Sequence, residues 1–432
     1  MLQPRALAFV ALSSLFFSSF SGAAFAQPVI GSANSASADP PVARPGTTPC
    51  TVTLFSGVAF ADYSPKSFSY APPAECKGPW AKVVLNADFA VSAGRQFDRT
   101  ANIWIGGANV YFGTTSEPSS TLARSWHVER DVTDYSALFT AAQAGEVDLG
   151  NTVDSTYTGI LTGTATLQLY PLARHEAAPR TADQVLPLSN SATGGTVALN
   201  GPTDSLARTF TLPTNVERAY LDVIAQSQGG DEFWYTCVPD DVAASVQSCG
   251  STGFRETEVT VDGTPAGVAP VYPWIFTGGI DPYLWEPIVG VQTYDFKPYR
   301  VDLTPFAGLL SDGKSHSVAL SVFNADNYFS TTASLLVYRD AGAKRVTGGV
   351  ARNTLAAAPV PAVKENLVTA ADGSITGNVT VASTRDFVIA GYVYTSHGRV
   401  DTSVAQHLAF SNSQSFTISD TTYIQDITQK TK

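Results

Sequence analysis

Short runs of alternating apolar and polar residues dominate the chain from residue 51 to 170. Runs such as TVTLFSGVAF, WAKVVLNADFAV and TATLQLYP are rich in Val, Thr and Tyr, and turn residues separate them at intervals of about 8–12 residues. A period of two is that of a strand with one buried face. Only DYSALFTAAQAG has a helical pattern, for about two turns. The pattern predicts an antiparallel β-sandwich or barrel.

The same order of elements returns between residues 215 and 339. VERAYLDVIAQSQ resembles PWAKVVLNADFAV, GFRETEVTVDGTPAG resembles QFDRTANIWIGGANV, and YRVDLTPFAGLL resembles VERDVTDYSALF. A repeat of this length indicates two copies of one structural unit. We therefore predict an all-β fold with two tandem antiparallel jelly-roll β-sandwich domains and a smaller C-terminal β region.

The N-terminus has one arginine, a short apolar stretch and an A-x-A sequence that ends at Ala26. These features are typical of a secretory signal peptide, so we expect a secreted or periplasmic protein. The C-terminal region stops in strand-like sequence, and is either complete there or truncated. The expected divisions are a signal peptide at 1–26, a leader at 27–50, the first jelly roll at 51–170, a linker with an edge strand at 171–214, the second jelly roll at 215–339, a linker at 340–364 and the C-terminal β region at 365–432.

Composition narrows the possible partners. The chain has 26 Lys and Arg against 37 Asp and Glu, for a net charge of −11, and it has no basic stripe, so nucleic acid is not an expected partner. No later apolar run is long enough to cross a bilayer. Five histidines lack the spacing of zinc ligands, so we expect no metal, and nothing suggests a cofactor. We take a monomer as the default expectation.

Four cysteines in an exported chain favour disulfides over free buried thiols. Pairing by proximity in sequence gives Cys50–Cys76 and Cys237–Cys249. No cysteine lies in a motif that suggests catalysis.

The second copy carries two insertions, at 229–253 and 265–297, where binding sites on a β scaffold tend to form. The first places Asp231, Glu232, Trp234 and Tyr235 after two glycines, and the second contains Trp285. Flat aromatic rings stack on sugar rings, and carboxylates accept hydrogen bonds from hydroxyl groups, so this combination suits a glycan. The other interpretation, that the tryptophans fill a core, stays open.

Asp98 lies between Phe97 and Arg99 at the head of a run that otherwise resembles a buried strand. One interpretation is a structural Asp–Arg pair, and the other is a general base. In the second copy, Arg255 and Glu256 occupy the matching position. Corresponding loops of two adjacent copies can face one another across a shared cleft, where chemistry is expected.

Many ordered motifs between residues 51 and 339 resemble those of the peptide N-glycosidase A family. They include GPWAKVVL, GRQFDR, EP followed by WHVERDVTDYSAL, VDLGNTVDSTYTG, DEFWYT, FRE and TGGIDPYLWEPI. The chain is also distantly similar to peptide N-glycosidase F, a two-jelly-roll enzyme. The loop from Cys237 to Cys249 departs from the family pattern.

This resemblance implies hydrolysis of the amide that joins an N-glycan to asparagine in N-glycoproteins or N-glycopeptides. The intact glycan would leave as a glycosylamine, and the asparagine would become aspartate. The family is also associated with acidic working conditions and with tolerance of core α1,3-fucose.

The resemblance also implies residue roles. FDRTAN matches the segment of peptide N-glycosidase F that carries its principal catalytic aspartate, which places that role on Asp98. The second key carboxylate of peptide N-glycosidase F aligns near Ser251, where this chain has no acidic residue. We therefore expect Glu232 to take its role, with Glu256 as the next candidate. The third acid of peptide N-glycosidase F aligns next to Asp154, which is therefore a further candidate.

The remaining candidates are expected to bind substrate. Arg99 or Arg255 would tune Asp98 or stabilise an oxyanion, while Trp234 and Trp285 would form a wall for the sugar, with Asp231 and Tyr235 beside them. Two other functions stay open. A glycoside hydrolase also uses two carboxylates, and a non-catalytic glycan-binding sandwich could share this fold.

Overall fold

The computed structural model describes residues 41–189, 191–277 and 293–432. The predicted signal peptide and most of the predicted leader lie outside these ranges. In the described part of the chain, no helix is both long and apolar enough to span a membrane.

The first half of the chain forms a sandwich of two four-stranded antiparallel sheets. One sheet has the order β1-β8-β3-β6 and the other the order β2-β7-β4-β5, which is the strand order of a jelly roll. A 3₁₀ helix, η1 (Thr133–Thr140), connects β6 to β7. The strands are β1 (Cys50–Phe60), β2 (Lys66–Tyr70), β3 (Trp80–Val91), β4 (Thr100–Ile105), β5 (Ala108–Thr114), β6 (Arg124–Asp131), β7 (Gln143–Asp148) and β8 (Leu161–Pro171).

Alternation along the strands builds the core of this sandwich. In β8, Leu161, Ala165, Leu167 and Leu169 are fully buried, while Thr162, Thr164, Thr166 and Gln168 alternate with buried positions and are partly exposed. β3 lies at the centre of its sheet and is buried along most of its length. A strand that is covered on both faces does not need to alternate apolar and polar residues, and the largely apolar run WAKVVL at the start of β3 fits this position.

The second sandwich repeats the strand order of the first. Its sheets have the orders β10-β17-β12-β15, with β9 also paired to β17, and β11-β16-β13-β14. Two jelly rolls are therefore confirmed. The strands are β9 (Gln184–Pro187), β10 (Val197–Leu199), β11 (Leu206–Thr211), β12 (Val216–Ser227), β13 (Glu256–Val261), β14 (Thr264–Pro270), β15 (Tyr299–Asp302), β16 (Ser315–Phe323) and β17 (Phe329–Arg339).

Short helices occupy the connections of this second sandwich. Two of them, η4 and α2, repeat the helical turn of η1, and the others lie in the loop after β12. They are η2 (Gly229–Asp231), η3 (Trp234–Thr236), α1 (Asp240–Ala243), η4 (Thr304–Phe306) and α2 (Ala307–Leu310).

The range 171–214, expected to hold a linker and one edge strand, contributes β9, β10 and β11 to the second sandwich. Each of these strands has only three to six residues, too few for a periodic pattern. The range 340–364, expected as a linker, likewise supplies β18 and the start of β19.

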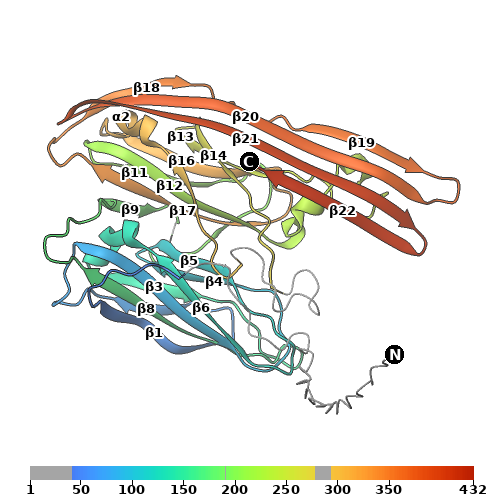
Figure 1. Ribbon diagram of the computed structural model, residues 1–432, viewed down its shortest axis with the longest axis horizontal. Helices are drawn as coiled ribbons and strands as arrows, with labels where there is room; N and C mark the ends of the chain where they lie inside the picture. Colours follow the sequence, from blue (N-terminus) through green and yellow to red (C-terminus); the bar gives the residue numbers. More distant parts are fainter. Residues whose placement is uncertain (1–40, 190, 278–292) are drawn as a thin grey trace, which may run out of the picture.

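The C-terminal region is one sheet with the order β18-β20-β21-β22, with β19 also paired to β20. It lies across the second sandwich (Figure 1), and Phe387, Ile389 and Val393 of this sheet join the core that contains Phe306 and Leu310. Its strands are β18 (Thr347–Asn353), β19 (Ala362–Thr369), β20 (Ile375–Thr395), β21 (Gly398–Ser419) and β22 (Thr422–Thr431).

Both predicted disulfides are confirmed. Cys50 pairs with Cys76 in the first sandwich, and Cys237 pairs with Cys249 in the loop after β12, with Cα–Cα distances of 6.2 and 4.5 Å. The second bond closes residues 237–249, which directly follow the segment that carries Glu232.

The two sandwiches lie side by side (Figure 1). Phe112 and Ile224 pack together with Trp274 and Phe296, whose rings stack 4.4 Å apart between centroids. Trp274 is therefore a core residue at the interface between the sandwiches. Next to this cluster, the carboxylate of Asp222 accepts hydrogen bonds from Tyr135 and Arg300.

Candidate active site

Three carboxyl groups from three loops come together where the two sandwiches meet. Asp98 lies between β3 and β4, Glu117 lies between β5 and β6, and Glu232 lies between β12 and β13. The charge of Asp98 acts on both glutamates, and the charge of Glu232 acts on Glu117. The loop that follows β3 and the equivalent loop that follows β12 thus supply one acid each.

Glu117 is coupled to Asp98 by a hydrogen bond between the two carboxyl groups. Burial raises the pKa of Glu117 to about 8, and the hydrogen bond and charge of Asp98 add to the shift, while Arg99 opposes it. Its Oε2 atom is buried without a hydrogen-bond partner. Glu117 therefore holds a proton at neutral pH and can donate it toward Asp98, which is exposed.

Glu117 is missing from the acids predicted from the sequence. It appears there only as the first residue of a family motif, 19 positions after Asp98. A signal did exist, since Asp98 and Glu117 flank the hairpin of β4 and β5, whose ends pair at Thr100 and Thr114.

Glu232 is partly buried, and this burial raises its pKa to about 7, with a further contribution from the charge of Asp98. Tyr235 lies close to it. The pKa of Tyr235 is raised to about 12, first by burial and then by the charge of Glu232. Asp98, Glu232 and Tyr235, all predicted site residues, therefore form one neighbourhood.

Arg99 lies behind Asp98 with its guanidinium almost fully buried. Nε donates to Asn151 Oδ1 (2.9 Å), and Nη1 donates to Gln96 Oε1 (3.0 Å) and to the Phe97 carbonyl (2.9 Å). Nη2 is buried without a hydrogen-bond partner. Burial lowers the pKa of Arg99 to about 10, while the charges of Glu117 and Asp98 oppose this effect.

Asp231 has a different environment from the substrate-facing one expected from the sequence. Its side chain is 0 % exposed and forms an ion pair with Arg255 (2.9 Å), whose side chain is also 0 % exposed. Its Oδ2 accepts three backbone N–H groups, from residues 326 to 328. Asp231 and Arg255 therefore fix the loop from behind, and neither side chain reaches a substrate surface.

Trp234 is also placed differently from the sugar wall that the sequence suggests. Its indole is fully buried in the core of the second sandwich, where it packs against Phe410 of β21. The ring anchors the loop from inside. Trp285, the other predicted wall, lies outside the described residues.

Glu256 and Asp154 lie in other surroundings than the three acids. Glu256 pairs with Arg385 of β20 (2.8 Å) beneath the C-terminal sheet, where burial raises its pKa to about 7. Asp154 is exposed and accepts the backbone N–H groups of Thr156 and Tyr157, which lower its pKa. Both carboxylates therefore have structural partners: Glu256 joins the sheet to the sandwich, and Asp154 shapes a turn.

Comparison with known proteins assigns the chain to a family. The family described as "Peptide N-acetyl-beta-D-glucosaminyl asparaginase amidase A" matches residues 39–355. This chain belongs to that family. The peptide-N4-(N-acetyl-beta-glucosaminyl)asparagine amidase A of Prunus dulcis is 30% identical over 393 residues, which cover 86% of this chain and 68% of that protein.

Among solved structures, PNGF-II has a TM-score of 0.46 at 13% identity, with 67% of this chain and 65% of that chain covered. PNGase F, a glycosylasparaginase from Flavobacterium meningosepticum, has a TM-score of 0.44 at 14% identity, with coverages of 68% and 96%.

The range that matches the amidase A family contains Asp98, Glu117 and Glu232 and ends at residue 355. Strands β19 to β22 follow that residue. In the described parts of this family member, no group of three or more His, Cys, Asp or Glu side chains is arranged to hold a metal ion.

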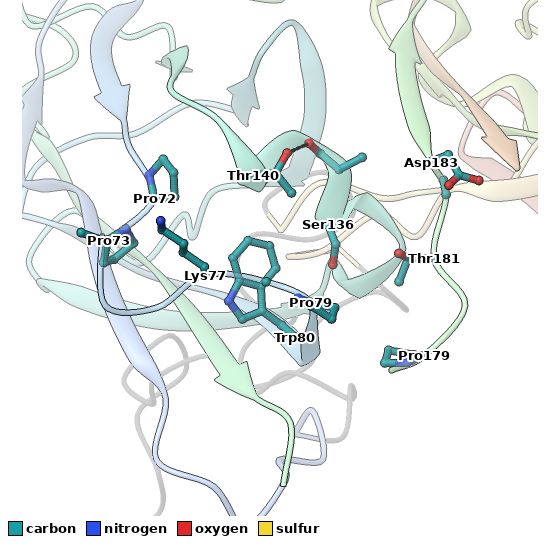
Figure 2. Close-up of a pocket in the computed structure, with 14 residues that line it drawn as sticks. Pro72, Pro73, Lys77, Pro79, Trp80, Ser136, Thr140, Pro179, Thr181 and Asp183 are labelled. Atoms are coloured by element: carbon teal, nitrogen blue, oxygen red, sulfur yellow. Dashed lines mark hydrogen bonds between the residues drawn. The ribbon is translucent and has the colours of Figure 1, made fainter. Parts of the chain in front are cut away.

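A large open pocket lies elsewhere on the first sandwich. It has a volume of about 700 Å³, and Trp80 lies in the middle of its labelled residues, near Lys77 and Pro79 (Figure 2). Trp80 begins β3, whereas Asp98 lies in the loop beyond the other end of that 12-residue strand, which spans roughly 36 Å at about 3.3 Å per residue. None of the three acids lines this pocket.

Proposed function

We propose that this protein is a peptide-N4-(N-acetyl-β-glucosaminyl)asparagine amidase that releases intact N-glycans and converts the glycosylated asparagine to aspartate. One observation carries the proposal: loops of both jelly rolls bring together Asp98, Glu117 and Glu232, one exposed acid beside two whose pKa values are raised. Membership of the amidase A family and the almond relative support the same activity.

In the proposed mechanism, the Asp98 carboxylate removes a proton from a water molecule. The water oxygen bonds to the amide carbonyl carbon, the carbon–nitrogen bond then breaks, and the proton returns to the departing nitrogen. The products are an aspartate side chain and a glycosylamine. A positioned base of this kind contributes about 10²–10⁴-fold to a rate.

Glu117 and Arg99 support Asp98 in this mechanism. Protonated Glu117 donates a hydrogen bond to Asp98 and keeps a second negative charge away from it. Arg99, whose Nη2 lacks a partner, supplies positive charge behind the two acids. Because Glu117 keeps its proton below about pH 8, the pair Asp98–Glu117 does not carry two negative charges there.

Glu232 and Tyr235 are the proposed sugar contacts. Glu232 is partly exposed and lies beside Asp98, where it can accept hydrogen bonds from the first GlcNAc. The partly exposed ring of Tyr235 offers an apolar face beside it. Acidic working conditions are proposed from the family, and the raised pKa values of Glu117 and Glu232 are compatible with them, because both groups keep protons at acidic pH. Tolerance of core α1,3-fucose is proposed from the family alone.

The test is incubation with two matched N-glycopeptides, one with and one without core α1,3-fucose, followed by mass spectrometry. We expect aspartate in the peptide and an intact glycan, first seen as the glycosylamine, from both substrates. A peptide that retains one GlcNAc would mean a glycoside hydrolase. An unchanged glycopeptide would favour a binding protein.

Replacing Glu117 by Gln is expected to change the pH profile more than the maximal rate. Activity of the wild type should fall as the pH rises through about 8, because Glu117 then ionises beside Asp98. The amide of Gln keeps a neutral hydrogen-bond donor at every pH, so the alkaline limb should be lost, with kcat at pH 5 within about fivefold of the wild type. An unchanged alkaline limb in kcat/KM would contradict the role of Glu117.

The two disulfides are consistent with an oxidising compartment. We propose that the protein is exported and meets N-glycoproteins or glycopeptides outside the cytoplasm. The predicted cleavage after Ala26 can be checked by sequencing the N-terminus of the mature protein.

A further inference from the structure

Three amide side chains of the C-terminal sheet bind the loop that carries Glu232. Asn412 Nδ2 donates to the carbonyl of Tyr235 (2.8 Å), Gln425 Nε2 to that of Thr236 (2.8 Å), and Gln414 Nε2 to that of Cys237 (2.9 Å). Three successive backbone carbonyls of the loop are thus held from β21 and β22. We call Asn412, Gln414 and Gln425 the amide ladder.

The amide ladder is a fully bonded network. Gln425 Nε2 also donates to Gln414 Oε1 (2.7 Å), Gln414 Nε2 to Asn412 Oδ1 (2.9 Å), and Asn412 Nδ2 to Gln429 Oε1 (3.0 Å). Each amide nitrogen therefore uses its two N–H groups, one toward the loop and one toward the next amide. A buried polar network rigidifies its surroundings when every member is bonded.

The amide ladder interrupts an otherwise apolar face. Asn412 is 1 % exposed and Gln414 is 0 % exposed. On the same face of β21, Phe410 packs against Trp234 on one side, and Phe416 and Ile418 pack near Val238 on the other. Buried amides cost stability unless they are hydrogen-bonded, so apolar residues would be the simpler choice if this face only had to pack.

The first carbonyl that the ladder binds, that of Tyr235, lies only three residues after Glu232, and the chain between them is tightly turned. The N–H of Thr236 donates to the Phe233 carbonyl (2.8 Å), and the N–H of Cys237 donates to the Trp234 carbonyl (3.1 Å). On the other side of Glu232, Asp231 is fixed by Arg255 and by the backbone of residues 326–328. Glu232 therefore lies between two rigid anchors.

We infer that the amide ladder is a positioning element of the active site, through which the C-terminal sheet holds Glu232 against Asp98. The inference rests on the proposed function and adds to the site a part of the chain that lies outside the family match, which ends at residue 355. Figure 1 shows β21 and β22 passing over the loop that follows β12. Asn412, Gln414 and Gln425 are positioning residues, because they act through the loop.

The test compares Gln414→Leu and Gln425→Leu with Ser413→Ala, an exposed neighbour on β21. Gln425 lies on the edge strand β22 and is partly exposed, so Gln425→Leu is expected to fold. We expect kcat on an N-glycopeptide to fall about 5-fold for Gln425→Leu and about 20-fold for Gln414→Leu, with KM changed by less than about threefold, because small displacements of a catalytic group are costly. Ser413→Ala should match the wild type.

Two further readouts separate positioning from general stability. The alkaline limb of the pH profile should move to lower pH in the two Leu variants, since a displaced Glu232 acts less on Glu117. Hydrogen exchange of residues 229–238 should also become faster than in Ser413→Ala. Folded Leu variants with wild-type kcat, pH profile and exchange would overturn the inference.

Failure of the proposed function gives a different result. If the wild type releases no glycan, then both the amidase assignment and the catalytic role of the ladder are overturned. If the wild type releases glycan and the folded Leu variants match it, then the proposed function stands and the ladder is merely structural.

Discussion

Asp98→Asn is expected to lower kcat for glycan release by about 10³-fold or more. Asparagine has nearly the same shape but cannot accept a proton from water at any working pH, and a positioned base contributes about 10²–10⁴-fold. KM should change little, because Glu232 and Tyr235 remain in place to bind the sugar. The measurement is steady-state kinetics on a defined N-glycopeptide at pH 5.

The structure supplies a matched control for this variant. Asp88, on β3 of the same sandwich, is exposed and pairs with the exposed His127, so Asp88→Asn should retain wild-type activity. Asp98 is itself exposed, so its replacement should leave the thermal unfolding midpoint nearly unchanged. Folded Asp98→Asn with more than a tenth of the wild-type kcat would remove Asp98 from the role of base.

Asp231→Ala is expected to destabilise the second sandwich by about 3–5 kcal/mol, the usual cost of leaving one member of a buried ion pair alone. The change would leave Arg255 buried without its carboxylate, and it would leave three backbone N–H groups of residues 326–328 without their acceptor. Glycan release should fall as well, because Glu232 is the next residue.

Urea unfolding measures this effect. Asp241→Ala, an exposed acid ten residues later in the same loop, should change the free energy of unfolding by less than about 0.5 kcal/mol. A loss below about 1 kcal/mol for Asp231→Ala would show that the buried pair does not hold the loop.

The repeat of motifs along the chain was enough to predict the main architecture. Both jelly rolls follow from strand patterns that recur in the same order, and both disulfides follow from pairing of neighbouring cysteines. The pairing of Asp98 with Glu232 was also within reach, because these residues follow equivalent strands of the two copies. Equivalent loops of adjacent copies emerge at corresponding ends of the two sandwiches.

Burial inside the loop after β12 could not be predicted from its sequence. DEFWYT looks like a polar and aromatic binding loop, yet Asp231 and Trp234 point inward, while the other four residues stay partly exposed. The direction of each side chain depends on two tight 3₁₀ turns and on the C-terminal sheet, neither of which has a local sequence signal.

The amide ladder is the clearest case of a feature hidden in the sequence. Asn412 and Gln414 lie in FSNSQSF, a segment that resembles a polar, solvent-facing strand. Their burial becomes visible only when the sheet is placed over the loop from Tyr235 to Cys237. Glu117 is hidden for a similar reason, since it meets Asp98 only through the register of the β4–β5 hairpin, in which Thr100 pairs with Thr114.

The most direct test of the central claim is glycan release in ¹⁸O-labelled water, with the peptide product sequenced by mass spectrometry. The account predicts that the peptide carries aspartate at the former glycosylation site, with one ¹⁸O atom in its side-chain carboxylate, because water attacks the amide carbon. An unlabelled asparagine at that position, bare or bearing one GlcNAc, would show that the glycosidic bond was cleaved instead, and would contradict the account.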